Sequence, residues 1–254
     1  MTYGTAVISS SSESAPSCSK SRALAELALA FVLILSVIWS PRPWQRVLWI
    51  FAAGGVAAMM AGSWDGPRPL GLRRGNFWRS LWVAGAALVF AAATVTMASH
   101  WHSLRLPQPS LTGMDPTAFG QVLLFVKSYW AYALWTFVQQ FLLQGFFLNR
   151  LLTILPAPKV AAFAGGALFA VAHLPNPILT VATFAWGFAA CLVFLRYRNL
   201  YPLAIAHAIF GITLAITIPG PVIRNMRVGL GYMTYGHGHA TSVSLKPQRP
   251  DGVH

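Results

Sequence analysis

Three glutamines interrupt the apolar stretch Trp135-Thr136-Phe137-Val138-Gln139-Gln140-Phe141-Leu142-Leu143-Gln144-Gly145. Residues four apart share one face of an α-helix, so Gln140 and Gln144 point to the same side, and Gln139 lies about 100° away from Gln140. Polar side chains are costly in hydrocarbon and usually face the interior of a helix bundle or a cavity. The stretch therefore predicts a membrane helix that carries polar groups inward.

Two later apolar stretches also carry polar groups. The first contains Phe169 and His173, four residues apart, with Asn176 shortly after, and the second contains His207 and, four residues later, Gly211. A single glutamine in a membrane helix commonly serves as packing glue between helices. Three polar-bearing helices in one chain favour a shared polar site over three separate packing contacts.

Composition requires a membrane environment. Of the 254 residues, 56% are hydrophobic and 9% charged, and mean hydropathy is +0.58. Soluble domains carry about 25% charged residues, so this chain is expected to be an integral membrane protein. The net charge of +13 comes mostly from basic residues that flank apolar runs, as in anchors that face anionic headgroups. Membrane lipids are therefore expected partners, and nucleic acid is not.

The spacing of the apolar runs predicts the fold class. A spanning helix needs roughly 20 residues, and the candidates are residues 23–40, 44–62, 79–98, 130–152, 159–174, 177–195 and 200–218. We expect an all-α, polytopic transmembrane helix bundle of about 7 to 8 spans. The predicted organisation is an N-terminal tail (1–21), the bundle (22–218) and a C-terminal tail (219–254).

Residues 119–129 precede the fourth apolar run without a strong helix breaker. A straight helix over 119–152 would be about 50 Å long, which exceeds one crossing. We therefore expect an interfacial helix or a bend in this region.

The placement of Lys and Arg predicts the orientation. Lys20 and Arg22 precede the first span, and further basic residues fall on the same side when the N-terminus is cytoplasmic. The expected location is the plasma (inner) membrane. Basic residues after 219 lie on the wrong side for seven spans, so either a re-entrant element returns the tail or the rule is violated there.

The order of the polar motifs resembles the CAAX-protease and bacteriocin-processing family (CPBP, also called Abi) of intramembrane endopeptidases. That family shows Glu-Glu-x-x-x-Arg, then Phe-x-x-x-His, then His-x-x-x-Asn or Asp. The corresponding segments here begin at Gln139, Phe169 and His207, within residues of about 120–215. The resemblance marks a divergent variant. Glutamines stand at both glutamate positions, Gln144 at the arginine position and Gly211 at the Asn or Asp position.

The resemblance implies an intramembrane endopeptidase that cuts a membrane-proximal peptide or a prenylated-type protein. In the family a glutamate activates water, and a neutral amide cannot be a general base. Imidazole titrates near neutrality, so the histidines are the candidate bases, with amides to orient water and stabilise the oxyanion. Loss of the arginine fits the loss of the glutamates, because an unpaired buried charge is costly. The predicted catalytic set is His173, His207, Gln139, Gln140, Gln144 and Asn176, and the predicted cavity residues are Phe169, Gly145 and Gly211.

The glutamines leave a second interpretation open. The chain could be a non-catalytic relative that binds a peptide or lipid in the same cavity; a small transporter is less favoured, because no inverted repeat is evident. The only glutamates are Glu13, in the N-terminal tail, and Glu26, near the start of the first span, and Asp115 lies in the loop before the fourth span. The two histidines remain the better candidates for the base. No cofactor is expected, and zinc is disfavoured because two histidines and amides lack a third strong ligand.

Overall fold

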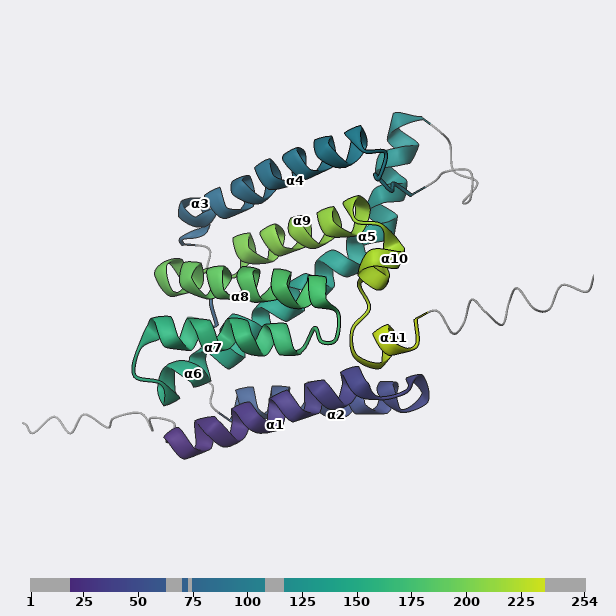
Figure 1. Cartoon of the computed structure of the whole chain (residues 1–254). Helices are drawn as coiled ribbons and strands as arrows, with labels where there is room; N and C mark the ends of the chain where they lie inside the picture. Colours follow the sequence, from purple (N-terminus) through teal and green to yellow (C-terminus); the bar gives the residue numbers. More distant parts are fainter. Residues whose placement is uncertain (1–18, 63–69, 73–74, 108–116, 236–254) are drawn as a thin grey trace, which may run out of the picture.

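The computed structural model describes residues 19–62, 70–72, 75–107 and 117–235, and every element assigned in these ranges is a helix (Figure 1). The predicted all-α, polytopic helical bundle is thereby confirmed. Residues 1–18 and 236–254 of the predicted tails lie outside the described residues, as do Glu13 and Asp115. In chain order the elements are α1 (Lys20–Trp39), α2 (Arg42–Ala61), α3 (Phe77–Ser80), α4 (Trp82–His100), α5 (Ala118–Gln140), the π-helix η2 (Phe141–Leu148), α6 (Asn149–Ile154), α7 (Pro158–Val171), α8 (Pro177–Tyr197), α9 (Tyr201–Thr217), α10 (Gly220–Ile223), the 3-10 turn η3 (Arg224–Met226) and α11 (Gly229–Met233).

Four helical segments of the described chain are long and apolar enough to cross a membrane, namely α1, α2, Phe77–His100 and α8. The apolar helices α7 and α9 are shorter, with 14 and 17 residues. At 1.5 Å per residue they measure about 21 and 26 Å, less than the ~30 Å of a hydrocarbon core. The protein is an integral membrane protein that combines full-length apolar helices with shorter ones.

The chain stays helical from Ala118 to Ile154. The separate interfacial helix expected over 119–129 is not seen, because α5 runs unbroken to Gln140 and the helix type changes only at Phe141. Figure 1 shows α5 crossing the other helices obliquely. Tilt lets a membrane helix exceed the thickness of the hydrocarbon core, and the 23 residues of α5, about 35 Å long, are compatible with one tilted crossing.

Close packing of α7 on α8 depends on two glycines. A Cβ on Gly166 would lie 2.9 Å from the backbone nitrogen of Phe188, and a Cβ on Gly187 would lie 3.2 Å from the Cα of Gly166. Small residues let membrane helices approach closely in this way. The contact fixes the end of α7, where the Phe169 and His173 motif lies.

The α1–α2 hairpin contacts the rest of the bundle through η2, α6 and α11. Ala30 and Val56 of the hairpin pack on Phe146 and Phe147 of η2. Figure 1 shows α4, α9, α8 and α7 one below another from the top of the view, with the α1–α2 hairpin at the bottom.

Both predicted tails contribute described structure. Helix α1 begins at Lys20, before the predicted bundle boundary at 22, because the Ser19 side chain accepts a hydrogen bond from the Arg22 backbone N–H at 3.3 Å and caps the helix. Residues 219–235 form helical turns, and the Gly229 N–H donates to the Leu174 carbonyl at 2.8 Å. This hydrogen bond holds the predicted C-terminal tail at Gly229 against Leu174, the residue after His173.

Candidate active site

Gln140 and His207 are joined directly inside the bundle. Gln140 is the last residue of α5 and fully buried, and His207 of α9 is 6% exposed. The Gln140 amide Nε2 donates a hydrogen bond to His207 Nδ1 at 2.8 Å. A neutral imidazole carries one N–H, so the proton of His207 then lies on Nε2. Gln140 therefore sets the tautomer of His207 and leaves its Nε2 as a donor.

His173 carries its ring hydrogen on the other nitrogen, Nδ1. It follows the end of α7, and its Nδ1 lies 2.7 Å from the Phe169 carbonyl oxygen. Because a carbonyl oxygen can only accept, Nδ1 carries the hydrogen and Nε2 holds the free lone pair. Nε2 of His173 is consequently available as a proton acceptor.

The Phe169 ring contacts both histidines edge-on. Its centroid lies 4.7 Å from the His173 ring and 5.7 Å from the His207 ring, at interplanar angles of 72° and 83°. The Trp186 ring of α8 lies 5.9 Å from that of His207. The two imidazoles are thus held among aromatic side chains.

Several buried polar atoms near the end of α5 have no protein partner in the described structure. Gln144 in η2 is fully buried, and both its Oε1 and Nε2 are unpaired, as are Gln140 Oε1 and Trp186 Nε1. A buried polar group without a partner costs about 1–3 kcal/mol. These atoms can therefore bind a water molecule or a polar group of a ligand with little competition from the protein.

A large, mainly apolar cavity lies between α1, α2, the α5–η2 helix and residues 226–234, with a volume of about 1110 Å³. Gln139, Phe169 and His173 line it. Gln140, Gln144 and His207 are buried behind this wall and are not among the lining residues. The predicted catalytic residues thus divide into a group at the cavity and a group in the core.

Asn176 uses its amide elsewhere. Its Oδ1 accepts from the Leu179 N–H at 3.2 Å and caps α8, while Nδ2 donates to the Ile223 and Arg227 carbonyls at 2.8 and 3.1 Å. The residue is fully buried and does not line the cavity. Its contacts position residues 223–227 and leave no amide hydrogen for an oxyanion.

The two predicted cavity glycines also lie in the core. Gly145 is buried, and its carbonyl accepts from Asn149 Nδ2 at 2.8 Å. Gly211 of α9 lies against the Tyr132 hydroxyl, where an added Cβ would overlap the phenol. The Tyr132 side chain therefore fills space that a larger residue at 211 would need.

Tyr132 was not predicted from the sequence, although a signal was present. Tyr132, Thr136, Gln140 and Gln144 follow one another at intervals of four, which places polar groups along one face of α5 as it approaches η2. Extending the glutamine spacing backwards along the chain would have identified it.

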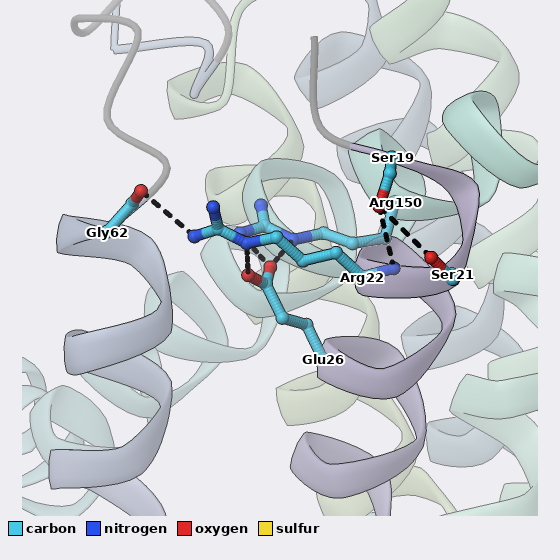
Figure 2. Close-up of polar contacts among 6 residues, drawn as sticks. All are labelled: Ser19, Ser21, Arg22, Glu26, Gly62 and Arg150. Carbon is cyan, nitrogen blue, oxygen red and sulfur yellow. Dashed lines mark hydrogen bonds and ion pairs between the residues drawn. The ribbon is translucent and has the colours of Figure 1, made fainter. Parts of the chain in front are cut away.

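A partly buried ion cluster joins α1 to α6 (Figure 2). The sequence analysis also missed it. The Glu26 carboxylate accepts from Arg150 Nε and Nη2 at 3.1 and 3.0 Å and from Arg22 Nε at 2.8 Å. Arg150 also lies 4.1 Å above the centre of the Phe146 ring, and Arg22 Nη2 donates to the Gly62 carbonyl at 3.0 Å. Glu26 is 8% exposed, so its carboxylate is committed to the arginines and is no candidate base. The sequence signal was an acidic residue inside an apolar run.

No group of three or more His, Cys, Asp or Glu side chains that could hold a metal ion occurs among the residues described. The absence of a cofactor requirement stays a prediction.

Comparison with known families covers the part of the chain that carries the site. Residues 121–213 match the family model described as type II CAAX prenyl endopeptidase Rce1-like. This match confirms the resemblance to the CPBP family over a segment that runs from α5 to α9 and includes all three motifs. At the family level it supports an intramembrane protease of the CPBP type. No curated protein and no solved structure matches the chain.

Proposed function

We propose that the protein is an intramembrane endopeptidase of the CPBP type in which His173 is the general base. The observation that carries the proposal is the position of its imidazole at the wall of the cavity, with Nδ1 bound to the Phe169 carbonyl and Nε2 left as acceptor. Glutamine cannot take a proton from water, and imidazole can do so near neutral pH.

The proposed reaction uses one water molecule. His173 Nε2 accepts a proton as the water oxygen attacks the scissile carbonyl carbon, and the oxyanion forms as the carbonyl double bond opens. The Gln139 amide, which also lines the cavity, donates to that oxyanion. His173 then gives its proton to the leaving amine as the C–N bond breaks. Gln140 acts through His207, whose position it fixes.

The substrate class follows from the cavity wall. Apolar side chains of α1 and α2, including Ile34, Trp49 and Val56, form much of it, which suits a peptide that is membrane-associated or carries a prenyl-type chain. The distribution of Lys and Arg supports a cytoplasmic N-terminus, and the plasma (inner) membrane is the proposed location.

One observation favours a second function, in which the protein binds a peptide or lipid without cutting it. The residues that line the cavity include no Asp or Glu, and Glu26 is held by Arg22 and Arg150. The site thus has a histidine base without a carboxylate to raise its basicity.

Peptide ends in the membrane proteome separate the two functions. Cells that lack the protein would be restored with wild type, with His173→Ala or with His100→Ala, a histidine at the exposed end of α4. The endopeptidase predicts new ends with wild type and His100→Ala that are missing with His173→Ala. Equal expression with no new ends from wild type would reject proteolysis and leave the binding function.

A further inference from the structure

Two arginines lie at one end of the cavity, where the chain turns between α1 and α2. Arg42 begins α2, and Arg227 precedes α11; both line the cavity and both are exposed. Gly229 packs against the backbone of Ile38 near the end of α1, where an added Cβ would overlap the Ile38 carbonyl oxygen. This contact brings Arg227, two residues before Gly229, to the α1–α2 turn that holds Arg42.

Neither guanidinium has an acidic partner in the described structure. Glu26 is the one acidic residue in the described ranges, and it pairs with Arg22 and Arg150. Arg227 lies 5.4 Å from the centre of the Tyr235 ring, a contact that leaves its N–H groups free for an anion. The cavity therefore has a cationic mouth.

The rest of the cavity is long and apolar. Along α2 its wall extends from Arg42 to Met60, a rise of about 27 Å at 1.5 Å per residue. The far end is lined by apolar side chains such as Phe31, Val56 and Phe147. This length is close to the ~30 Å of a bilayer core, so an extended hydrocarbon chain fits along it.

We infer that the cavity binds an anionic phospholipid of the surrounding bilayer, with its phosphate at Arg42 and Arg227 and an acyl chain along α2. The position of the arginines relative to the bilayer favours this occupant. Arg42 begins α2, a 20-residue helix long enough to span the membrane, and the ends of such a helix lie at the level of the lipid headgroups. The outer face of α2 exposes Trp44, Ile50 and Phe51 by 66%, 74% and 65%, so the hairpin borders lipid. This lipid site does not depend on the proposed proteolysis.

The bound lipid covers part of the candidate active site, because Gln139 and His173 line the same cavity. A peptide then reaches His173 when the lipid leaves. Anionic lipid and peptide therefore compete for the cavity, a consequence that does rest on the proposed function.

Native mass spectrometry of the full chain in neutral detergent tests the site. Phosphatidylglycerol and phosphatidylcholine with the same acyl chains are added in equal amounts, and the retained ratio is measured. One arginine contact with an anionic lipid is worth about 5-fold in affinity. We expect wild type to retain phosphatidylglycerol preferentially, Arg42→Gln and Arg227→Gln each to lower the ratio about 5-fold, and the double variant to bind both lipids equally.

Three controls make the outcome decisive. Arg46→Gln changes an exposed arginine of α2 that does not line the cavity, and it should keep the wild-type ratio. Arg227→Lys preserves the charge and should keep most of the preference. Ala53→Trp fills the cavity from α2 and should abolish retention of both lipids. Equal retention of the two lipids by wild type, or the same loss with Arg46→Gln as with Arg42→Gln, would overturn the inference.

Discussion

Gln140 on α5 donates a hydrogen bond to Nδ1 of His207 on α9 over 2.8 Å, between two side chains that are buried in the bundle. The pair lies 67 residues apart in the chain. It links the first and third motifs of the CPBP-like segment with no charged group between them. A glutamine thus makes a defined contact where the family has a glutamate.

Replacement of this glutamine should destabilise the protein. Gln140→Leu leaves His207 Nδ1 buried without a donor, and such a group costs about 1–3 kcal/mol. We expect a lower midpoint of thermal unfolding in detergent. Gln121→Leu, at an exposed position of α5, is the matched control and should leave the midpoint nearly unchanged. Equal midpoints for the two variants would show that the hydrogen bond contributes nothing.

The ion pair between α1 and α6 should be costly to break. Glu26→Gln removes the carboxylate that binds Arg150 at 3.0 and 3.1 Å, and loss of one partner of a buried pair costs about 3–5 kcal/mol. Arg79→Gln, at an exposed arginine, should have little effect. The double variant Glu26→Leu with Arg150→Met should recover stability relative to Glu26→Gln, because no buried charge is left alone. A double variant less stable than Glu26→Gln would contradict this reading of the cluster.

Gly211 and Tyr132 should behave as a coupled pair. Gly211→Asn introduces the residue of the family motif but overlaps the Tyr132 ring, and overpacking a core costs about 1–3 kcal/mol. Tyr132→Ala should relieve that overlap. The loss of stability in the double variant should therefore be smaller than the sum of the losses in the two single variants. Strict additivity in this double-mutant cycle would mean that the two side chains do not compete for space.

The α7–α8 contact provides a test of helix packing. Gly166→Ala places a Cβ 2.9 Å from the backbone nitrogen of Phe188, and backbone cannot move aside as a flexible side chain can. We expect the free energy of unfolding to fall by about 1–3 kcal/mol, measured as a lower midpoint of thermal unfolding. Gly54→Ala on α2 has nothing within 4 Å of the new Cβ and should be neutral or slightly stabilising, since alanine favours helices. A neutral Gly166→Ala would argue against the close approach.

Local sequence patterns predicted the all-α bundle. They also predicted that the helices carrying the three motifs share a polar site. Apolar run length reports burial in a membrane directly, and the four-residue spacing reports which residues share a face. The Phe169 contact with His173, four residues later, follows from that spacing. The catalytic roles of these residues stay predictions.

Local spacing does not predict contacts between helices that are far apart in the chain. The Glu26–Arg150 pair joins residues 124 apart and depends on which faces of α1 and α6 meet. Asn176 was interpreted as a site amide because it follows His173 in the chain, yet its Nδ2 group binds the 223–227 backbone. That backbone forms helical turns that apolar periodicity does not mark, so the partner of Asn176 could not be anticipated.

Hydrolysis by the purified protein in liposomes tests the central claim most directly. The substrate is a peptide spanning a junction whose new end depends on wild type in cells, and the cleavage rate is compared among wild type, His173→Ala and His100→Ala. A general base contributes about 10²–10⁴-fold, so we predict cleavage by wild type and His100→Ala and a loss of at least about 100-fold with His173→Ala. An unchanged rate with folded His173→Ala, or no cleavage by wild type, would contradict the assignment of His173 as the base.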